Sequence, residues 1–293
     1  MAAQIPQRVS ERAQLELFRS VPGDVSPRDA QDLMSWPFFS LAKRKRVTPI
    51  DFVMGATQIS VEAVPEHGMA TIWDADVLIW AASQIVEARD AGRPTSRLMA
   101  TTPHEILAFT GRGTGRDHYD RLKAALDRLQ STTVATSIRQ EQQRRRHRFS
   151  WINEWRELAD ARGRACGIEL ILPDWFYAGV VNRSLVLTID RAYFQLTGGL
   201  ERWLYRLVRK HGGFQAGDGA STSLTCISNR ARSPLKQFAF DVRAIVQRQA
   251  LPGYRLTIEH AFGRERLMFV ANPVDPIDKA MRRLKLKPVE NRP

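Results

Sequence analysis

The chain contains the same succession of predicted elements twice, and this repeat limits the folds that it can adopt. Each copy predicts a long helix, a short helix, a turn, a second long helix and then two β-rich runs. The first copy spans about residues 73–155 and the second about 190–270. A helix-turn-helix followed by a β-hairpin is the layout of a winged helix. The repeat therefore predicts an α+β fold with two tandem winged-helix domains.

The first copy has clear boundary signals. Thr102 and Glu105 form a capping-box pattern that starts a short helix, and a Gly-rich turn leads to a second helix over 117–130. Runs over 132–138 and 149–152 follow and read as two strands. The charged loop between them comes just after the helix-turn-helix, so we expect it to be the wing.

The second copy predicts a helix over 191–210, a short helix over 223–228 and a further helix that starts at Ser233. Two strands, 254–260 and 266–270, complete it as a hairpin with a glycine in its turn. The last helix has an apolar face and an outward face that carries Lys236, Phe240, Arg243 and Gln247. An outward phenylalanine is unusual. It either meets a thymine methyl group or packs against the other domain, and we expect packing.

We divide the chain into four parts. Residues 1–30 are polar and contain three prolines, which predicts a flexible tail. The first winged-helix domain is expected over 31–160 and the second over 161–272. Residues 273–293 are basic and contain prolines, so we expect a second tail.

The charge of the chain indicates a polyanionic partner. Lys and Arg total 44 against 31 acidic residues, which gives a formal net charge of +13. Such a balance favours binding to nucleic acid through phosphate contacts. A basic protein without that partner, or one that binds a membrane surface, is the alternative.

Several other classes are disfavoured by the sequence. Cys166 and Cys226 have no CxxC spacing, so we expect no zinc site, no disulfide and no metal or other cofactor. No apolar run approaches the ~18 residues of a membrane span. The N-terminus lacks the apolar segment of a secretory signal, so we expect a cytoplasmic protein.

The sequence does not indicate an enzyme. The run 111–115 lacks the lysine and hydroxyl of a phosphate-binding loop, so we expect a turn. The six histidines are isolated and do not form the paired motif of nicking initiators.

Candidate DNA-binding residues lie in the basic segments, in the turns and on the outward faces of the second helices. For each of them the alternative is an ordinary solvated charge. Acidic residues reduce the charge of the helix over 117–130, so the helix that starts at Ser233 is the better candidate for specific readout. The candidates are Lys43, Arg44, Lys45, Arg46, Arg112, Arg116, Arg121, Lys123, Arg128, Arg144, Arg145, Arg146, Arg230, Arg232, Lys236, Arg243 and Gln247.

Seven short motifs resemble a known family. They are WPFFSLAKRKR at 36–46, TPHEIL at 102–107, YDRLKAALDRL at 119–129, FSWI at 149–152, PDWF at 173–176, LERWLYR at 200–206 and SPLKQF at 233–238. Together they resemble the plasmid replication initiator protein A family of proteobacteria over about residues 34–272.

The resemblance implies a protein that starts plasmid replication by binding repeated origin sequences in double-stranded DNA, without nuclease activity. Similar initiators melt or bend origin DNA and recruit the host's replication initiator and helicase proteins. Some also dimerise and repress their own promoters, so a homodimer is an open alternative. No catalytic residues are implied.

Two other functions stay open. The first is a winged-helix transcriptional repressor that acts on its own promoter. The second is a rolling-circle nicking enzyme, which the missing paired histidines disfavour.

Overall fold

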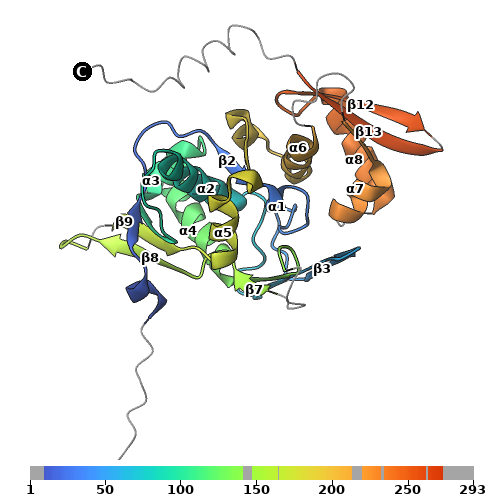
Figure 1. Ribbon diagram of the computed structural model, residues 1–293. Coiled ribbons are helices and arrows are strands. Elements are labelled where there is room, and N and C mark those ends of the chain that lie inside the picture. The colour runs from blue at the N-terminus through green and yellow to red at the C-terminus, as the bar shows by residue number, and fades with distance from the viewer. Residues whose placement is uncertain are drawn as a thin grey trace, which may run out of the picture.

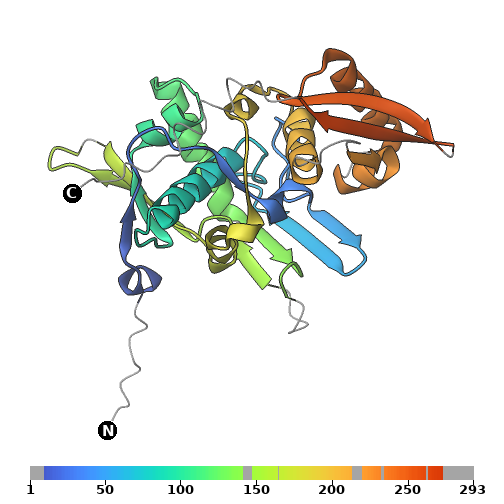
Figure 2. The same cartoon turned by 45° about the horizontal axis from the view of Figure 1, so that its top comes forward.

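The computed structural model describes residues 10–140, 147–163, 165–212, 220–231, 234–261 and 263–272. Figure 1 shows two α+β units side by side, the first on the left and the second on the right. Helix α6 lies between α2 and the rest of the second unit in both Figure 1 and Figure 2.

The first unit has the topology of a winged helix. Its strands form a sheet in the order β1-β5-β9-β8, in which β9 is antiparallel to both neighbours. Its long first helix, α2, is buried along most of its length. In chain order the elements are α2 (Ala75–Asp90), β5 (Leu98–Thr101), α3 (Pro103–Phe109), α4 (Arg116–Ser131), β8 (Glu154–Ala159) and β9 (Ala165–Ile171).

The second unit repeats this topology, so the predicted fold is confirmed. Its sheet has the order β11-β13-β12. The last strand of the unit, β13, lies between the other two, as β9 lies between β5 and β8 in the first unit. The β12–β13 hairpin is twice as long as β11 and projects from the body at the right of Figure 2. The elements are α6 (Gly199–His211), β11 (Ala220–Ser223), α7 (Leu224–Ala231), α8 (Leu235–Arg248), β12 (Tyr254–Ala261) and β13 (Arg264–Ala271).

The prediction of the first wing was wrong. The strands expected there, β6 (Thr132–Thr136) and β7 (His147–Ser150), do pair with each other. However, they belong to a separate sheet of order β3-β4-β6-β7, because β6 also pairs with β4 (Thr57–Ala63). The hairpin that completes the first winged helix is β8–β9. The expected domain boundary at 160/161 therefore falls inside that hairpin.

The structure also differs from the expected tail over residues 10–30. Strand β1 (Leu17–Arg19) pairs in parallel with β5, and β2 (Arg28–Ala30) pairs with β10 (Val186–Thr188). Phe18 and Val25 are buried. A few apolar residues spaced among prolines are sufficient to anchor this segment. Short elements complete the fold: η1 (Glu11–Gln14), α1 (Gln31–Met34), β3 (Ile50–Met54), α5 (Asp174–Val181), η2 (Arg183–Leu185) and η3 (Arg191–Gln195).

The single helix expected over 191–210 is interrupted at residues 196–198, between η3 and α6, and α6 begins at Gly199. A Cβ atom on Gly199 would overlap the carbonyl oxygen of Leu41 and lie 3.0 Å from the Trp73 ring. The glycine therefore allows the backbone of the first unit to approach the start of α6 closely.

We expect Gly199→Ala to lower the free energy of unfolding by about 1–3 kcal/mol or more. This is the usual cost of overpacking, and the added Cβ would meet a backbone carbonyl, which cannot change rotamer. Gly198→Ala is the control, since the atoms nearest its Cβ would belong to the Glu201 side chain and not to backbone. Urea unfolding of both variants measures the difference. Equal, small effects would show that the Leu41 segment moves aside.

Buried ion pairs join the second unit to the rest of the fold. Asp76 of α2 accepts from Arg202 of α6 at 2.7 Å, and both side chains are 3% exposed. Asp29 of β2 accepts two hydrogen bonds from Arg206, at 2.6 and 2.9 Å. Burial alone would lower the pKa of Arg206, but Asp29 outweighs it and raises that pKa.

None of the described helices is long and apolar enough to cross a lipid bilayer.

Candidate nucleic-acid interface

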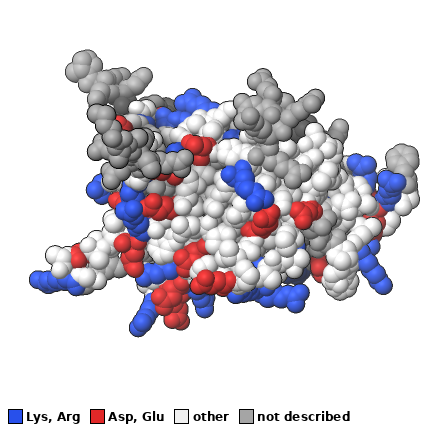
Figure 3. Space-filling view, turned by 90° about the horizontal axis from the view of Figure 1, so that it is seen from below, with Lys and Arg blue, Asp and Glu red and all other residues white. Residues whose placement is uncertain are grey.

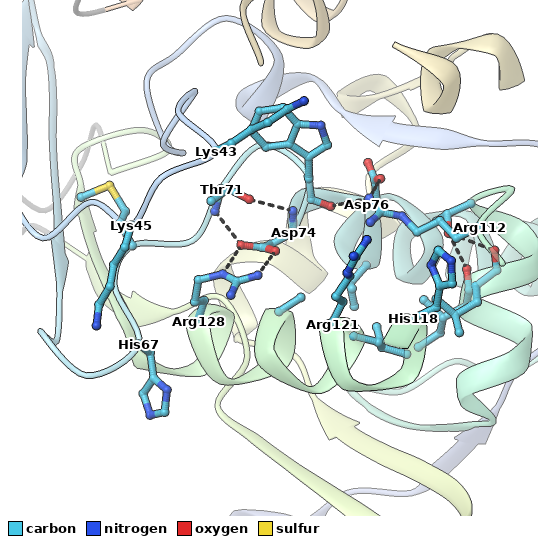
Figure 4. A pocket seen from close by; sticks show the side chains of 18 of the residues that line it. Lys43, Lys45, His67, Thr71, Asp74, Asp76, Arg112, His118, Arg121 and Arg128 are labelled. Atoms are coloured by element: carbon cyan, nitrogen blue, oxygen red, sulfur yellow. Dashed lines mark hydrogen bonds and ion pairs between the residues drawn. The ribbon is translucent and has the colours of Figure 1, made fainter. Parts of the chain in front are cut away.

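A groove of about 670 Å³ lies between α4 and the chain segment at residues 43–45. Figure 4 shows Arg121 and Arg128 extending from α4 toward the side that carries Lys43. The groove therefore brings together two basic regions that are about 80 residues apart in the sequence. Its polar lining is Lys43, Arg44, Lys45, His67, Thr71, Asp74, Asp76, Thr110, Arg112, His118, Arg121 and Arg128.

The segment at residues 43–46, which forms one side of the groove, is held in place by hydrogen bonds of its backbone and side chains. The amide of Met69 donates to the carbonyl of Arg46 at 2.7 Å, and the Lys45 ammonium donates to the carbonyl of Glu66 at 2.7 Å. Lys43 lies over the Trp73 ring at 5.7 Å. Arg46 does not line the groove, because its guanidinium donates to the carbonyl of Thr48.

Two arginines of the groove have structural partners. Arg128 binds Asp74 in a bidentate pair with distances of 2.8 and 2.7 Å, and these hydrogen bonds raise its pKa. Arg112 donates to Asp76 at 2.7 Å. Asp76 therefore contacts both the turn before α4 and Arg202 of the second unit. Burial raises the pKa of the Asp76 carboxyl, although the two guanidinium groups oppose that shift.

Other candidates near α4 lie outside the groove lining. Arg116 is 94% exposed, and its one ion-pair contact among the described residues is a long one, 4.0 Å to Asp120. Lys123 pairs with Glu157 of β8 at 2.7 Å, which ties the helix to the sheet.

Helix α8 presents the outward face that its sequence predicts. Phe238, Val242 and Ile245 are buried, whereas Lys236 and Gln247 are exposed. Leu235, the first residue of the helix, is apolar but 45% exposed.

The expected packing of Phe240 was wrong, because this side chain is 65% exposed. Arg243 is half-exposed and binds Glu265 of β13 through two contacts of 2.7 Å. Arg230 lies in α7, where the sequence predicts a turn, and stacks over Trp36 at 4.8 Å.

Four predicted contacts, Arg144, Arg145, Arg146 and Arg232, lie outside the described residues. The hairpins that form the wings add two candidates that the sequence did not indicate. Arg162 is exposed in the turn between β8 and β9, and Arg264 is exposed beside the turn between β12 and β13. Arg162 could have been found only with the correct strand pairing of the first unit, whereas Arg264 lies beside the turn of a hairpin that the sequence does predict.

The charges on one further face of the molecule are mixed. Figure 3 shows basic and acidic side chains interspersed over the face seen from below, without a continuous patch of one sign. Within the part of the chain that the structure describes, no three His, Cys, Asp or Glu side chains come together as a metal site. Cys166 and Cys226 are free thiols.

The repeated helix-turn-helix and hairpin define a tandem winged-helix protein. The family model of Replication initiator protein A matches residues 28–256. The chain belongs to this family, which gives it a role in the initiation of replication. It is 30% identical over 193 residues to a putative replication protein of Wigglesworthia glossinidia brevipalpis, covering 64% of this chain and 70% of that protein.

Solved structures share the fold. A crystal structure of selenomethionine derivatives of domains 2 and 3 of RctB covers 81% of this chain and 95% of that chain, with a TM-score of 0.59 and 13% identity. A second structure, of RctB domains 2–3, covers 86% and 98%, with a TM-score of 0.52 and 13% identity.

Proposed function

We propose that this chain is a non-catalytic initiator that binds repeated sequences in the double-stranded DNA of a plasmid origin. Helices α4 and α8 each follow a helix-turn of a winged helix, the position of a recognition helix in the major groove. The observation that carries the proposal is the groove beside α4, where Lys43, Arg44, Lys45 and Arg121 have no carboxylate partner among the described residues. Recruitment of host initiator and helicase proteins follows from the family and is part of the proposal.

The physical driving force of the proposed binding is release of counterions from phosphates. The logarithm of the affinity then falls linearly with the logarithm of salt concentration, by about 0.9 per phosphate contact. Four cations without a carboxylate partner among the described residues lie around one recognition helix, and together with the exposed cations of the second unit they predict a slope steeper than about −4.

A salt titration of the full chain on its own plasmid's origin fragment and on a random duplex of equal length measures this slope. We expect steep slopes on both duplexes and a higher affinity for the origin fragment than for the random duplex at every salt concentration. A flat salt dependence would contradict the proposed interface.

The same surfaces could act at a promoter, which makes autorepression the second candidate. The duplicated winged helix leaves no separate ligand-binding domain in the described part of the chain. A reporter driven by the chain's own promoter distinguishes the two functions, since an initiator without autorepression leaves expression unchanged.

A further inference from the structure

The groove beside α4 contains more positive charge than its ion pairs use. Its lining includes six Lys and Arg residues and two carboxylates, and both carboxylates are occupied by Arg128 and Arg112. The four other cations, Lys43, Arg44, Lys45 and Arg121, have no carboxylate partner among the described residues, although Lys45 donates to the carbonyl of Glu66. Two of them, Arg44 and Arg121, are exposed and have no hydrogen-bond or ion-pair partner among the described residues.

We propose that this groove binds the sugar–phosphate backbone of one DNA strand, next to the major groove that α4 enters. The inference rests on the proposed function and extends it, because the 43–45 segment precedes the first winged helix in the chain. In this arrangement the 43–45 segment contacts the DNA backbone from the side opposite the recognition helix.

The geometry of DNA supports a strand at this place. A helix in the major groove has a row of phosphates on either side, since the groove is about 12 Å wide and a helix with side chains is nearly as broad. A wall of cations that faces α4 across an open groove is placed to hold one of these rows. The apolar lining, which includes Trp73, Leu122 and Ala125, gives the sugars a surface to contact.

The walls are organised before any strand binds. The amide of Ile72 donates to the carbonyl of Ser40 at 2.9 Å, and the amide of Ser40 donates to the carbonyl of Ala70 at 3.0 Å. The segment 40–46 therefore runs beside the segment 66–72. Lys45 packs against Gly68, whose φ of +79° and missing Cβ leave room for the lysine stem. Binding therefore orders few additional side chains, which limits its entropic cost.

The test removes the two unpartnered cations with Arg44→Ala plus Arg121→Ala. The control, Arg93→Ala plus Arg183→Ala, removes the same charge from exposed positions at the far end of α2, about 24 Å from the groove. Affinities for the origin fragment and for random duplex are measured across a salt series, and thermal unfolding confirms that both variants fold.

We expect the groove variant to bind both duplexes at least tenfold more weakly than the control, with a salt slope shallower by about 1.8, because it loses two phosphate contacts. Duplexes in which single phosphates are replaced by neutral methylphosphonates locate the contact. A replacement that weakens the wild type but not the groove variant marks the bound phosphate.

The other outcomes distinguish a failure of the strand inference from a failure of the proposed function. If the wild type prefers its origin and the groove variant matches the control, the strand inference is overturned and the proposed function stands. If the wild type shows no preference for its origin, the proposed function fails first. If inorganic phosphate or ATP raises the melting temperature of the wild type but not of the groove variant, and DNA binding is equal in both, the groove is a small-anion site and the inference is wrong.

Discussion

Asp29→Ala is expected to lower the free energy of unfolding by about 3–5 kcal/mol, the cost of leaving one partner of a buried ion pair alone. Asp29 and Arg206 are 2% and 1% exposed, so water cannot replace the lost carboxylate. One nitrogen of Arg206, Nη1, already has no hydrogen-bond partner in the part of the chain that the structure describes. The variant would leave a guanidinium almost without partners in the core, and the β2 segment would lose its attachment to α6.

Asp24→Ala is the matched control for this variant. Asp24 also pairs with an arginine, Arg191, but it is 82% exposed, and such pairs contribute about 0–1 kcal/mol. Chemical denaturation of both variants gives the comparison. Adding Arg206→Met to Asp29→Ala should recover part of the loss, because an apolar side chain of similar length replaces the unpaired charge. Equal stabilities of the Asp29 and Asp24 variants would contradict the buried pair.

The outward face of α8 is expected to carry much of the sequence preference. Replacing Lys236, Phe240 and Gln247 together by alanine should weaken binding to origin DNA by at least about 3 kcal/mol, more than a hundredfold, because each base-edge contact contributes about 1–3 kcal/mol. Binding to random duplex should fall less than tenfold, since only one cation is removed. All three side chains are exposed, so the fold should be unaffected.

Arg93→Ala, which removes one exposed cation far from α8, is the control for that loss of charge. Competition binding with origin and random duplexes gives the ratio of affinities. An equal loss on both duplexes would mean that α8 contacts only phosphate. A loss no larger than that of the control would mean that α8 does not enter the DNA.

Arg243 illustrates how ion pairing changes a predicted contact. Its bidentate pair with Glu265 joins α8 to the wing, so it must exchange partners before it can bind a phosphate or base. We expect Glu265→Gln to strengthen binding to random duplex by two- to tenfold, because it removes a competing carboxylate and with it one negative charge from the interface. Filter binding at constant salt measures the change, and weaker binding would assign Arg243 a purely structural role.

The second unit could be predicted from its sequence, and the first could be predicted only in part. In β12 and β13 the buried residues Leu256, Leu267 and Phe269 alternate with less buried ones, which is the pattern of a hairpin with one buried face. Strand β8 has no such alternation, because Arg156 and Glu157 are both exposed. The strands inserted before it, β6 and β7, carry the stronger β pattern, although they pair with the N-terminal sheet.

The site was predictable as a set of residues but not as a groove. The cluster at 43–46 and the cations of α4 are visible in the sequence, whereas their approach depends on the bridge between Ser40 and Thr71. One missed signal was available. Arg202 and Arg206 lie one helical turn apart among the apolar residues of α6, and buried arginines require acidic partners such as Asp29 and Asp76.

The most direct test of the account is a footprint of the full chain on its own plasmid's DNA at ~150 mM salt, where nonspecific charge pairing is weak. The account predicts protection of tandem direct repeats at the origin, in contacts that extend over more than one major groove. Protection of a single inverted repeat at a promoter would favour a repressor instead. Uniform protection without sequence preference would contradict origin binding.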